Sequence, residues 1–149
     1  MATWGEFTTA IPEMADKGRG LLYRTGGGEA LIATVRGAEP PRVHPIAVEV
    51  VGAGLYAFIL GSPKLTDLEE DGRYALHAYP DAARPHEFVV RGRVRPVDVA
   101  TRSRLAADWP FSVGSARAFE FLIDEALLGE RDSRADWPPR YSAWRASVT

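Results

Sequence analysis

Residues 43–60 read VHPIAVEVVGAGLYAFIL and contain two apolar runs separated by Gly-Ala-Gly at 52–54. Valine, isoleucine and aromatic residues are concentrated in both runs, which is typical of β-strands. Three residues can close an antiparallel hairpin, whereas a parallel pair needs a crossover of a dozen or more residues. The stretch therefore predicts two neighbouring antiparallel strands.

Similar runs occur on both sides of this hairpin. They lie at 21–23, 30–35, 74–79, 87–97, 119–128 and 141–146. Segments such as GGGE and RGAEPPR separate them and carry turn chemistry. Gly92, inside 87–97, predicts a bend or bulge of the kind found in closed sheets. The 119–128 run is long enough for a helix, but the alternation of Phe119, Phe121 and Ile123 favours a strand.

Helix signals occur at the N-terminus and after the 87–97 run. Thr3 and Glu6 form a capping box, so a helix is expected to begin there. Pro12 is expected to break it into two short pieces, the second of which ends at Gly18. Asp98 is expected to cap a later helix. Together these patterns predict an α+β domain of six or seven mostly antiparallel strands, closed as a small barrel with peripheral helices.

Composition limits the classes of function. The 149 residues fit one domain, which we place over 1–149, and the net charge of −2 gives no reason to expect nucleic acid or an anionic membrane as a partner. The absence of cysteine excludes disulfides, thiolate metal sites and cysteine nucleophiles. The first twenty residues lack the apolar core of a signal peptide, and no run reaches the length of a membrane span. We expect a cytoplasmic protein.

The segment GSPKLTDLEEDG at 61–72 contains a helix whose charges oppose its dipole. Ser62 is a favourable N-cap, Pro63 suits the first helical position and Gly72 can end the helix. However, Lys64 lies in the first turn, where the helix dipole favours an acid. A bound anion beside this turn would account for the lysine. An exposed lysine that tolerates the dipole is the alternative.

The order of these motifs resembles the pyridoxamine 5′-phosphate oxidase-like family of FMN-binding split β-barrels. The resemblance covers roughly residues 19–98 closely and the rest of the chain more loosely. It lies in the run LIATVRGAEPPRVHPIAVEVVGAGLYAFILGSPKLTDLEEDGRYALH followed by EFVVRGRV. It implies a six- to seven-stranded antiparallel split β-barrel and a homodimer that binds FMN, or in some branches the deazaflavin coenzyme F420, at the subunit interface.

The resemblance also implies which residues contact the cofactor. The segment that lines the flavin corresponds to Arg42, Val43, His44, Pro45, Ile46 and Ala47. Ala57 and Phe58 correspond to ring contacts on the next strand, Ser62 and Lys64 to the phosphate clasp, and Glu87 to a polar contact from a later strand.

Three departures separate the chain from the biosynthetic oxidase of that family. Pro63 stands where the oxidase clasp has an arginine, and Glu87 stands where it has a glutamine. The segment WPPRYSAWRA at 137–146 also lacks the arginine–histidine pair of the oxidase's substrate site. The sequence therefore resembles the shorter relatives that keep the cofactor site and act on another substrate.

The resulting hypothesis is an FMN-dependent oxidoreductase that acts on a small molecule, with the flavin as redox centre. No catalytic side chain and no metal site is predicted. A deazaflavin would need a basic groove for its acidic tail, for which Arg36, Arg91, Arg93 and Arg95 are candidates, although a solvated strand face also explains the last three. A flavin-binding, stress-related module without turnover is the alternative from another class.

Overall fold

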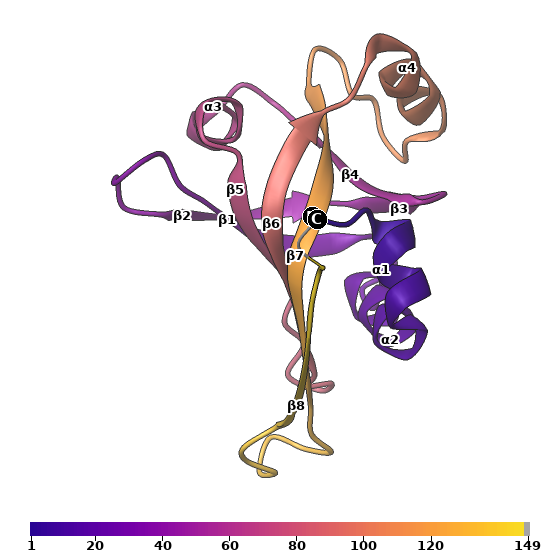
Figure 1. The fold of residues 1–149 in the computed structure, drawn as a ribbon, viewed down its shortest axis with the longest axis vertical. Coiled ribbons are helices and arrows are strands. Elements are labelled where there is room, and N and C mark those ends of the chain that lie inside the picture. Colours follow the sequence, from indigo (N-terminus) through magenta and orange to yellow (C-terminus); the bar gives the residue numbers. More distant parts are fainter. Residues whose placement is uncertain (148–149) are drawn as a thin grey trace.

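A computed structural model describes residues 1–147, in which eight strands and four helices form one curled sheet with helices around it (Figure 1). The helices are α1 (Trp4–Ala10), α2 (Pro12–Leu22), α3 (Pro63–Glu70) and α4 (Val99–Asp108). The strands are β1 (Glu29–Thr34), β2 (Arg42–Ala47), β3 (Glu49–Val51), β4 (Gly54–Ile59), β5 (Arg73–Ala78), β6 (Glu87–Pro96), β7 (Arg117–Glu130) and β8 (Arg140–Arg145). None of the helices within 1–147 has the length and apolarity that crossing a membrane requires.

The sheet is antiparallel throughout and follows the order β2-β1-β5-β6-β7-β4-β3, with β8 added to β7. The fourteen-residue β7 holds this arrangement together, because it pairs with β4 at its start, with β6 along its length and with β8 at its end. The α+β split barrel expected from the sequence is confirmed. The predicted strand at 119–128 is confirmed as the middle of β7.

The core lies between the concave face of the sheet and the two N-terminal helices. Phe7 of α1 stacks on Phe88 of β6 at a ring-centroid distance of 6.3 Å, and it also contacts Trp144 of β8 at 5.1 Å. Met14 and Leu22 of α2 are buried in the same cluster. An aromatic ring buries a large apolar area, so this cluster fixes α1 and α2 against the sheet.

Three local predictions differ from the structure. The 21–23 run is not a strand, because Leu21 and Leu22 form the last turn of α2. Gly18 does not end that helix, which continues to Leu22. The 43–51 run is split at Val48, whose N–H bonds Gly28 O at 3.0 Å, and this split contributes to the count of eight strands instead of six or seven.

Gly18 lies inside α2, where the packing requires a residue without a side chain. A Cβ atom at this position would overlap the ring of Phe88, so only glycine lets α2 approach β6 this closely. Gly92 has the same function in the sheet, where the register shifts between Arg91 and Gly92 and a Cβ would overlap Leu122 O. The bulge predicted at Gly92 is therefore confirmed.

We expect Gly18→Ala and Gly20→Ala to change stability in opposite directions. Both glycines lie in α2, but a Cβ at Gly20 meets nothing within 4 Å. Gly18→Ala should lower the free energy of unfolding by about 1–3 kcal/mol through overpacking. Gly20→Ala should raise it by up to about 1 kcal/mol through helix propensity. Urea denaturation measures both values, and a neutral Gly18→Ala would contradict the close packing.

Candidate functional site

The first turn of α3 is built as the sequence predicts. The Ser62 hydroxyl accepts a hydrogen bond from the Leu65 N–H at 3.3 Å and donates one to Leu60 O at 2.9 Å. Pro63 has no N–H to satisfy, and the Thr66 N–H bonds Ser62 O at 3.2 Å. The Ser62 hydroxyl therefore uses its donor and one of its two acceptor sites within the chain.

Lys64 is half-buried and forms no ion pair or side-chain hydrogen bond with another residue in 1–147. Lys17, the other lysine of the chain, bonds Glu130 at 3.2 Å and Glu13 at 3.3 Å. Lys64 thus lies at the positive end of a helix dipole without a compensating carboxylate. An anion at this place would be attracted by both the ammonium group and the helix terminus.

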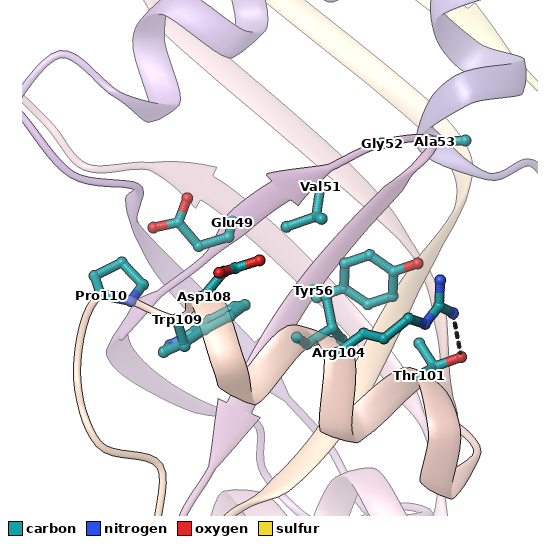
Figure 2. Close-up of a pocket in the computed structure, with 11 residues that line it drawn as sticks. Glu49, Val51, Gly52, Ala53, Tyr56, Thr101, Arg104, Asp108, Trp109 and Pro110 are labelled. Atoms are coloured by element: carbon teal, nitrogen blue, oxygen red, sulfur yellow. Dashed lines mark hydrogen bonds between the residues drawn. The ribbon is translucent and has the colours of Figure 1, made fainter.

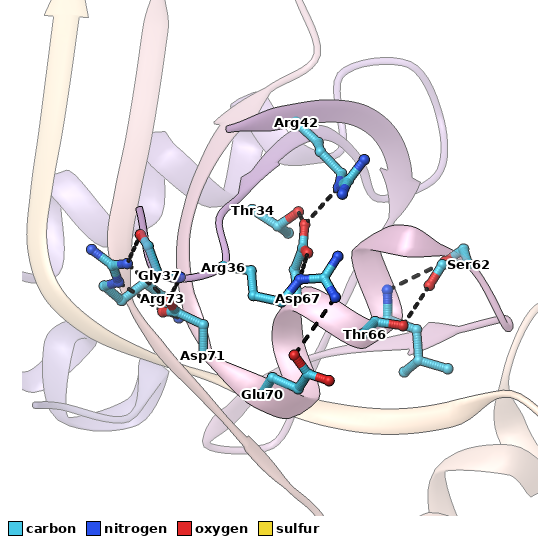
Figure 3. Close-up of polar contacts among 11 residues, drawn as sticks. Thr34, Arg36, Gly37, Arg42, Ser62, Thr66, Asp67, Glu70, Asp71 and Arg73 are labelled. Carbon is cyan, nitrogen blue, oxygen red and sulfur yellow. Dashed lines mark hydrogen bonds and ion pairs between the residues drawn. The ribbon is translucent and has the colours of Figure 1, made fainter. Parts of the chain in front are cut away.

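One turn further along α3, the carboxylate of Asp67 lies in the interior between two arginines (Figure 3). The residue is only 1% exposed. Its Oδ2 accepts hydrogen bonds from the Thr34 hydroxyl at 2.8 Å and from Arg42 Nε at 3.0 Å, while its Oδ1 lies 3.3 Å from Arg36 Nε. Because a buried carboxylate needs compensation, these contacts fix α3 against β1 and β2.

The acids at the other end of α3 each pair with an arginine. Glu69 pairs with Arg117, and Glu70 lies 3.6 Å from Arg36. Asp71 bonds Arg73 Nε at 2.7 Å and accepts a hydrogen bond from Gly37 N–H at 2.7 Å. These bonds lower the pKa of the Asp71 carboxyl well below its usual range, the Arg73 hydrogen bond being the larger cause. The charges that oppose the helix dipole therefore serve tertiary contacts.

Strand β2 places the predicted flavin-lining residues on two faces. Residues directly opposite each other in neighbouring strands share a face. Arg42, His44 and Ile46 oppose the buried Thr34, Ile32 and Ala30, so they face the inside of the barrel. Val43, Pro45 and Ala47 face outward, and Val43 is 64% exposed.

The position of β2 leaves one of its sides open. It is the first strand of the sheet order, and among residues 1–147 its strand partner is β1. Pro45, which has no N–H to donate to a partner strand, suits this edge position. Inside the barrel, the Nε2 atom of His44 is buried without a hydrogen-bond partner. A buried polar atom without a partner is uncommon and is available for a ligand or water.

The remaining predicted residues are not gathered at this place in one chain. Ala57 is fully buried in the core, and Phe58 packs edge-on against Trp109 of α4 at 4.8 Å between ring centroids. Glu87 is the first residue of β6. Gly92, five residues later in β6, pairs with Tyr74 of β5. Tyr74 pairs with Thr34 of β1, and Thr34 pairs with Arg42 of β2. At about 3.3 Å per residue, Glu87 lies roughly 17 Å along the strands from Arg42.

A cavity of about 410 Å³ lies between α4 and the β3–β4 hairpin (Figure 2). It is lined by Glu49, Val51, Gly52, Ala53, Tyr56, Thr101, Arg104, Leu105, Asp108, Trp109 and Pro110. Arg104 donates to the Thr101 hydroxyl at 3.1 Å, and Glu49 accepts from the Tyr23 hydroxyl at 2.5 Å. Burial raises the pKa of Tyr56. The volume of the cavity and its mixture of apolar and polar groups suit a small organic molecule.

Sequence reasoning missed two features of the site. Asp67 was not selected, although it is three residues after Lys64 and therefore on the same side of the helix. An acid between Leu65 and Leu68 on a half-buried helix was the available signal. The cavity residues come from β3, β4 and α4, and no local motif connects them.

Comparison with solved structures shows the fold of pyridoxamine 5′-phosphate oxidase-like split barrels. A Clostridium acetobutylicum protein related to general stress protein 26, of the pyridoxinephosphate oxidase family, superposes with a TM-score of 0.63 at 11% identity, over 86% of this chain and 95% of that one. PhzG from Burkholderia lata, in complex with tetrahydrophenazine-1-carboxylic acid, superposes with a TM-score of 0.62 at 12% identity, over 91% of this chain and 92% of that one. An FAD-binding protein from Mesorhizobium loti superposes with a TM-score of 0.51 at 19% identity, over 66% of this chain and 80% of that one.

No protein-family model matches the sequence, and no curated protein matches it either. At these identities, the structural similarity is one of fold, and the function has to be argued from the site.

We expect Asp71→Asn to reduce stability in a pH-dependent way. Because the folded pKa of Asp71 is lowered, its ionised form stabilises the protein above its unfolded pKa of about 3.9. This contribution is lost as pH falls below that value towards the folded pKa. The difference in unfolding free energy between wild type and Asp71→Asn should therefore be largest above pH ~5 and shrink in acid. Urea titrations from pH 2.5 to 7 test this, and a pH-independent difference would contradict it.

Proposed function

We propose that this split-barrel protein binds FMN and is a flavin-dependent oxidoreductase that acts on a small molecule. The observation that carries the proposal is a pair of cationic groups with unused donors, one in the first turn of α3 and the other bonded to Asp67 of the same helix. They are the ammonium group of Lys64 and the amino groups of Arg42, which Asp67 holds by Nε alone. A phosphate monoester is the anion that such a pair at a helix N-terminus suits best.

The phosphate would take the place of a counter-ion for Lys64. With Pro63 at the first helical position and Ser62 capping Leu65, the Lys64 N–H has no acceptor within residues 1–147. This N–H, the Lys64 ammonium and the Arg42 amino groups provide donors from α3 and β2 for one anion. The phosphate would then compensate the positive charge of Lys64, which opposes the dipole of α3.

The ring system would lie along β2. The open edge of this strand presents backbone N–H and C=O groups without a strand partner. The outward Val43, Pro45 and Ala47 provide an apolar surface beside that edge. A flavin needs both features, because its ring is flat and apolar on its faces but carries hydrogen-bonding atoms along one edge. The FAD-binding protein of the same fold supports a flavin as the ligand class.

The charge pairs favour FMN over the deazaflavin. The acidic tail of the latter needs free cations, and three of the four arginines considered for it pair with carboxylates. Arg36 contacts Asp67 and Glu70, and Arg91 contacts Glu125. Arg95 lies 2.8 Å from Glu120, and Arg93 donates to Asp71 O at 3.1 Å.

The partner would be a second copy of the chain. The outward side of the sheet carries half-buried apolar residues such as Leu31, Val89 and Leu127, and the exposed Val43 lies on the same side. An apolar sheet face of this kind is suited to burial against another subunit. A second subunit would also explain why Glu87 is far from Arg42 in one chain, since it could reach the cofactor of its partner.

A bound flavin supplies the redox chemistry, because it accepts and donates hydride. The chain itself would anchor the phosphate through Lys64 and Arg42 and orient the ring along β2. Two hollows offer space for a ligand. One of about 420 Å³ lies against Pro45, Ile46 and Ala47 of β2, and the other is the cavity under α4, beside the strand β4 that leads into the phosphate clasp. Reduction of bound FMN by a nicotinamide donor would distinguish an enzyme from a flavin-binding module without turnover.

We expect the purified protein to bind FMN with a visible flavin spectrum, and Lys64→Ala to weaken that binding. The loss of one charge-assisted contact should raise the Kd of FMN about tenfold or more. Riboflavin, which lacks the phosphate, should bind wild type and variant equally. Fluorescence titration measures both ligands, with Lys17→Ala as the matched control. Equal FMN affinity in Lys64→Ala would refute the clasp.

We expect Val43→Arg to convert a dimer into monomers, because it places a charge on the most exposed apolar residue of the proposed interface. Val99→Arg is the control, since Val99 is 83% exposed but lies on α4. Light scattering after gel filtration gives the mass of each species. A wild-type monomer, or a Val43→Arg protein that remains dimeric, would exclude this face as the interface.

A further inference from the structure

We propose that Asp67 is a positioning residue, which holds the guanidinium group of Arg42 so that its two amino groups face the phosphate of the cofactor. This inference rests on the proposed FMN site and assigns a role to a residue that does not itself touch the cofactor.

The hydrogen bonds of Arg42 show how the orientation is set. Asp67 Oδ2 binds the inner nitrogen Nε at 3.0 Å, and the Thr34 hydroxyl binds the same oxygen at 2.8 Å (Figure 3). The two terminal nitrogens of Arg42 form no hydrogen bond within residues 1–147. A guanidinium group has a fixed planar shape, so holding Nε determines where the two amino groups point.

The Asp67 carboxylate is itself held firmly. Its side chain is 2% exposed, whereas those of Arg36 and Arg42 are 36% and 38% exposed. The rigid partner is therefore the acid, and the arginines are the groups that would otherwise move in solvent. A long side chain fixed before the ligand arrives loses less conformational entropy on binding.

If Asp67 acted only through its charge, it would weaken FMN binding instead of strengthening it. A carboxylate near a phosphate repels it, so a purely electrostatic role means that removing the charge tightens FMN binding. Arg36 offsets this repulsion, because it lies 3.3 Å from the other oxygen of Asp67. Without the carboxylate, both arginines would lose their buried partner and turn towards water, and Arg42 would leave the clasp. The direction of the change in affinity therefore distinguishes positioning from simple charge.

The test is a titration of wild type and Asp67→Asn with FMN and with riboflavin, monitored by flavin fluorescence. We expect Asp67→Asn to raise the Kd of FMN about tenfold and to change the Kd of riboflavin less than twofold, because the lost contact is to the phosphate. Glu70→Gln is the matched control. It removes an acid of the same helix that contacts Arg36 but not Arg42, and it should leave both Kd values unchanged.

A double-mutant cycle tests the route through Arg42. Once Arg42→Gln has removed the guanidinium group, adding Asp67→Asn should weaken FMN binding no further. Thr34→Val provides a second variant if Asp67→Asn does not fold. It keeps the carboxylate but removes one of its hydrogen bonds, and it should raise the Kd of FMN by about threefold with riboflavin unchanged.

Three outcomes would overturn the inference. Unchanged or tighter FMN binding in Asp67→Asn would show that Asp67 does not hold Arg42 for the phosphate. An equal loss of FMN and riboflavin would show a structural role only. If the wild-type protein binds neither ligand, the proposed function fails, and the inference fails with it. The first two results leave the proposed function intact, so the two failures are distinguishable.

Discussion

The buried carboxylate of Asp67 is the contact on which the geometry of the candidate site depends. A carboxylate that is 1% exposed must be paired and hydrogen-bonded, and its partners here come from β1, β2 and the loop between them. These contacts tie α3 to β1 and β2. They connect the helix that carries Lys64 with the strand that carries Arg42, although twenty-one other residues separate the two cations in the chain.

The sheet provides the support for this arrangement. Strand β7 pairs with three other strands, so the two halves of the curled sheet share one element. Helices α1 and α2 fill the concave face with Phe7, Met14 and Leu22. The concave side is thus closed by the chain itself, whereas no helix within residues 1–147 covers the outward side of β2, β1, β5 and β6. This asymmetry leaves the outward side open to the second subunit that we propose.

The distribution of charge separates structural from uncommitted groups. Most of the acids around α3 neutralise arginines: Asp67 with Arg36 and Arg42, and Asp71 with Arg73. The unfavourable placement of acids at the end of the helix is accepted because these pairs connect it to the sheet. Lys64 has no such partner within the described residues, and the amino groups of Arg42 remain free. The site is defined by the cationic donors that the fold does not use.

Signals that act within a few residues were sufficient for much of the fold. Apolar runs rich in strand-forming residues identified β1, β4 and β6, alternation identified β7, and capping chemistry located the starts of α1, α3 and α4. Val43 and His44 could be assigned to one strand from the sequence, but their opposite faces follow from the register with β1. Likewise, Gly18 has the local signature of a helix end, yet it lies inside α2. The residue is glycine because Phe88, seventy residues away, leaves no space for a side chain there. The pairing of Asp67 also depends on long-range packing. Dihedral preferences and capping hydrogen bonds are local and are encoded within each segment, whereas register, close approach and the pairing of buried charges exist only once distant segments are packed together.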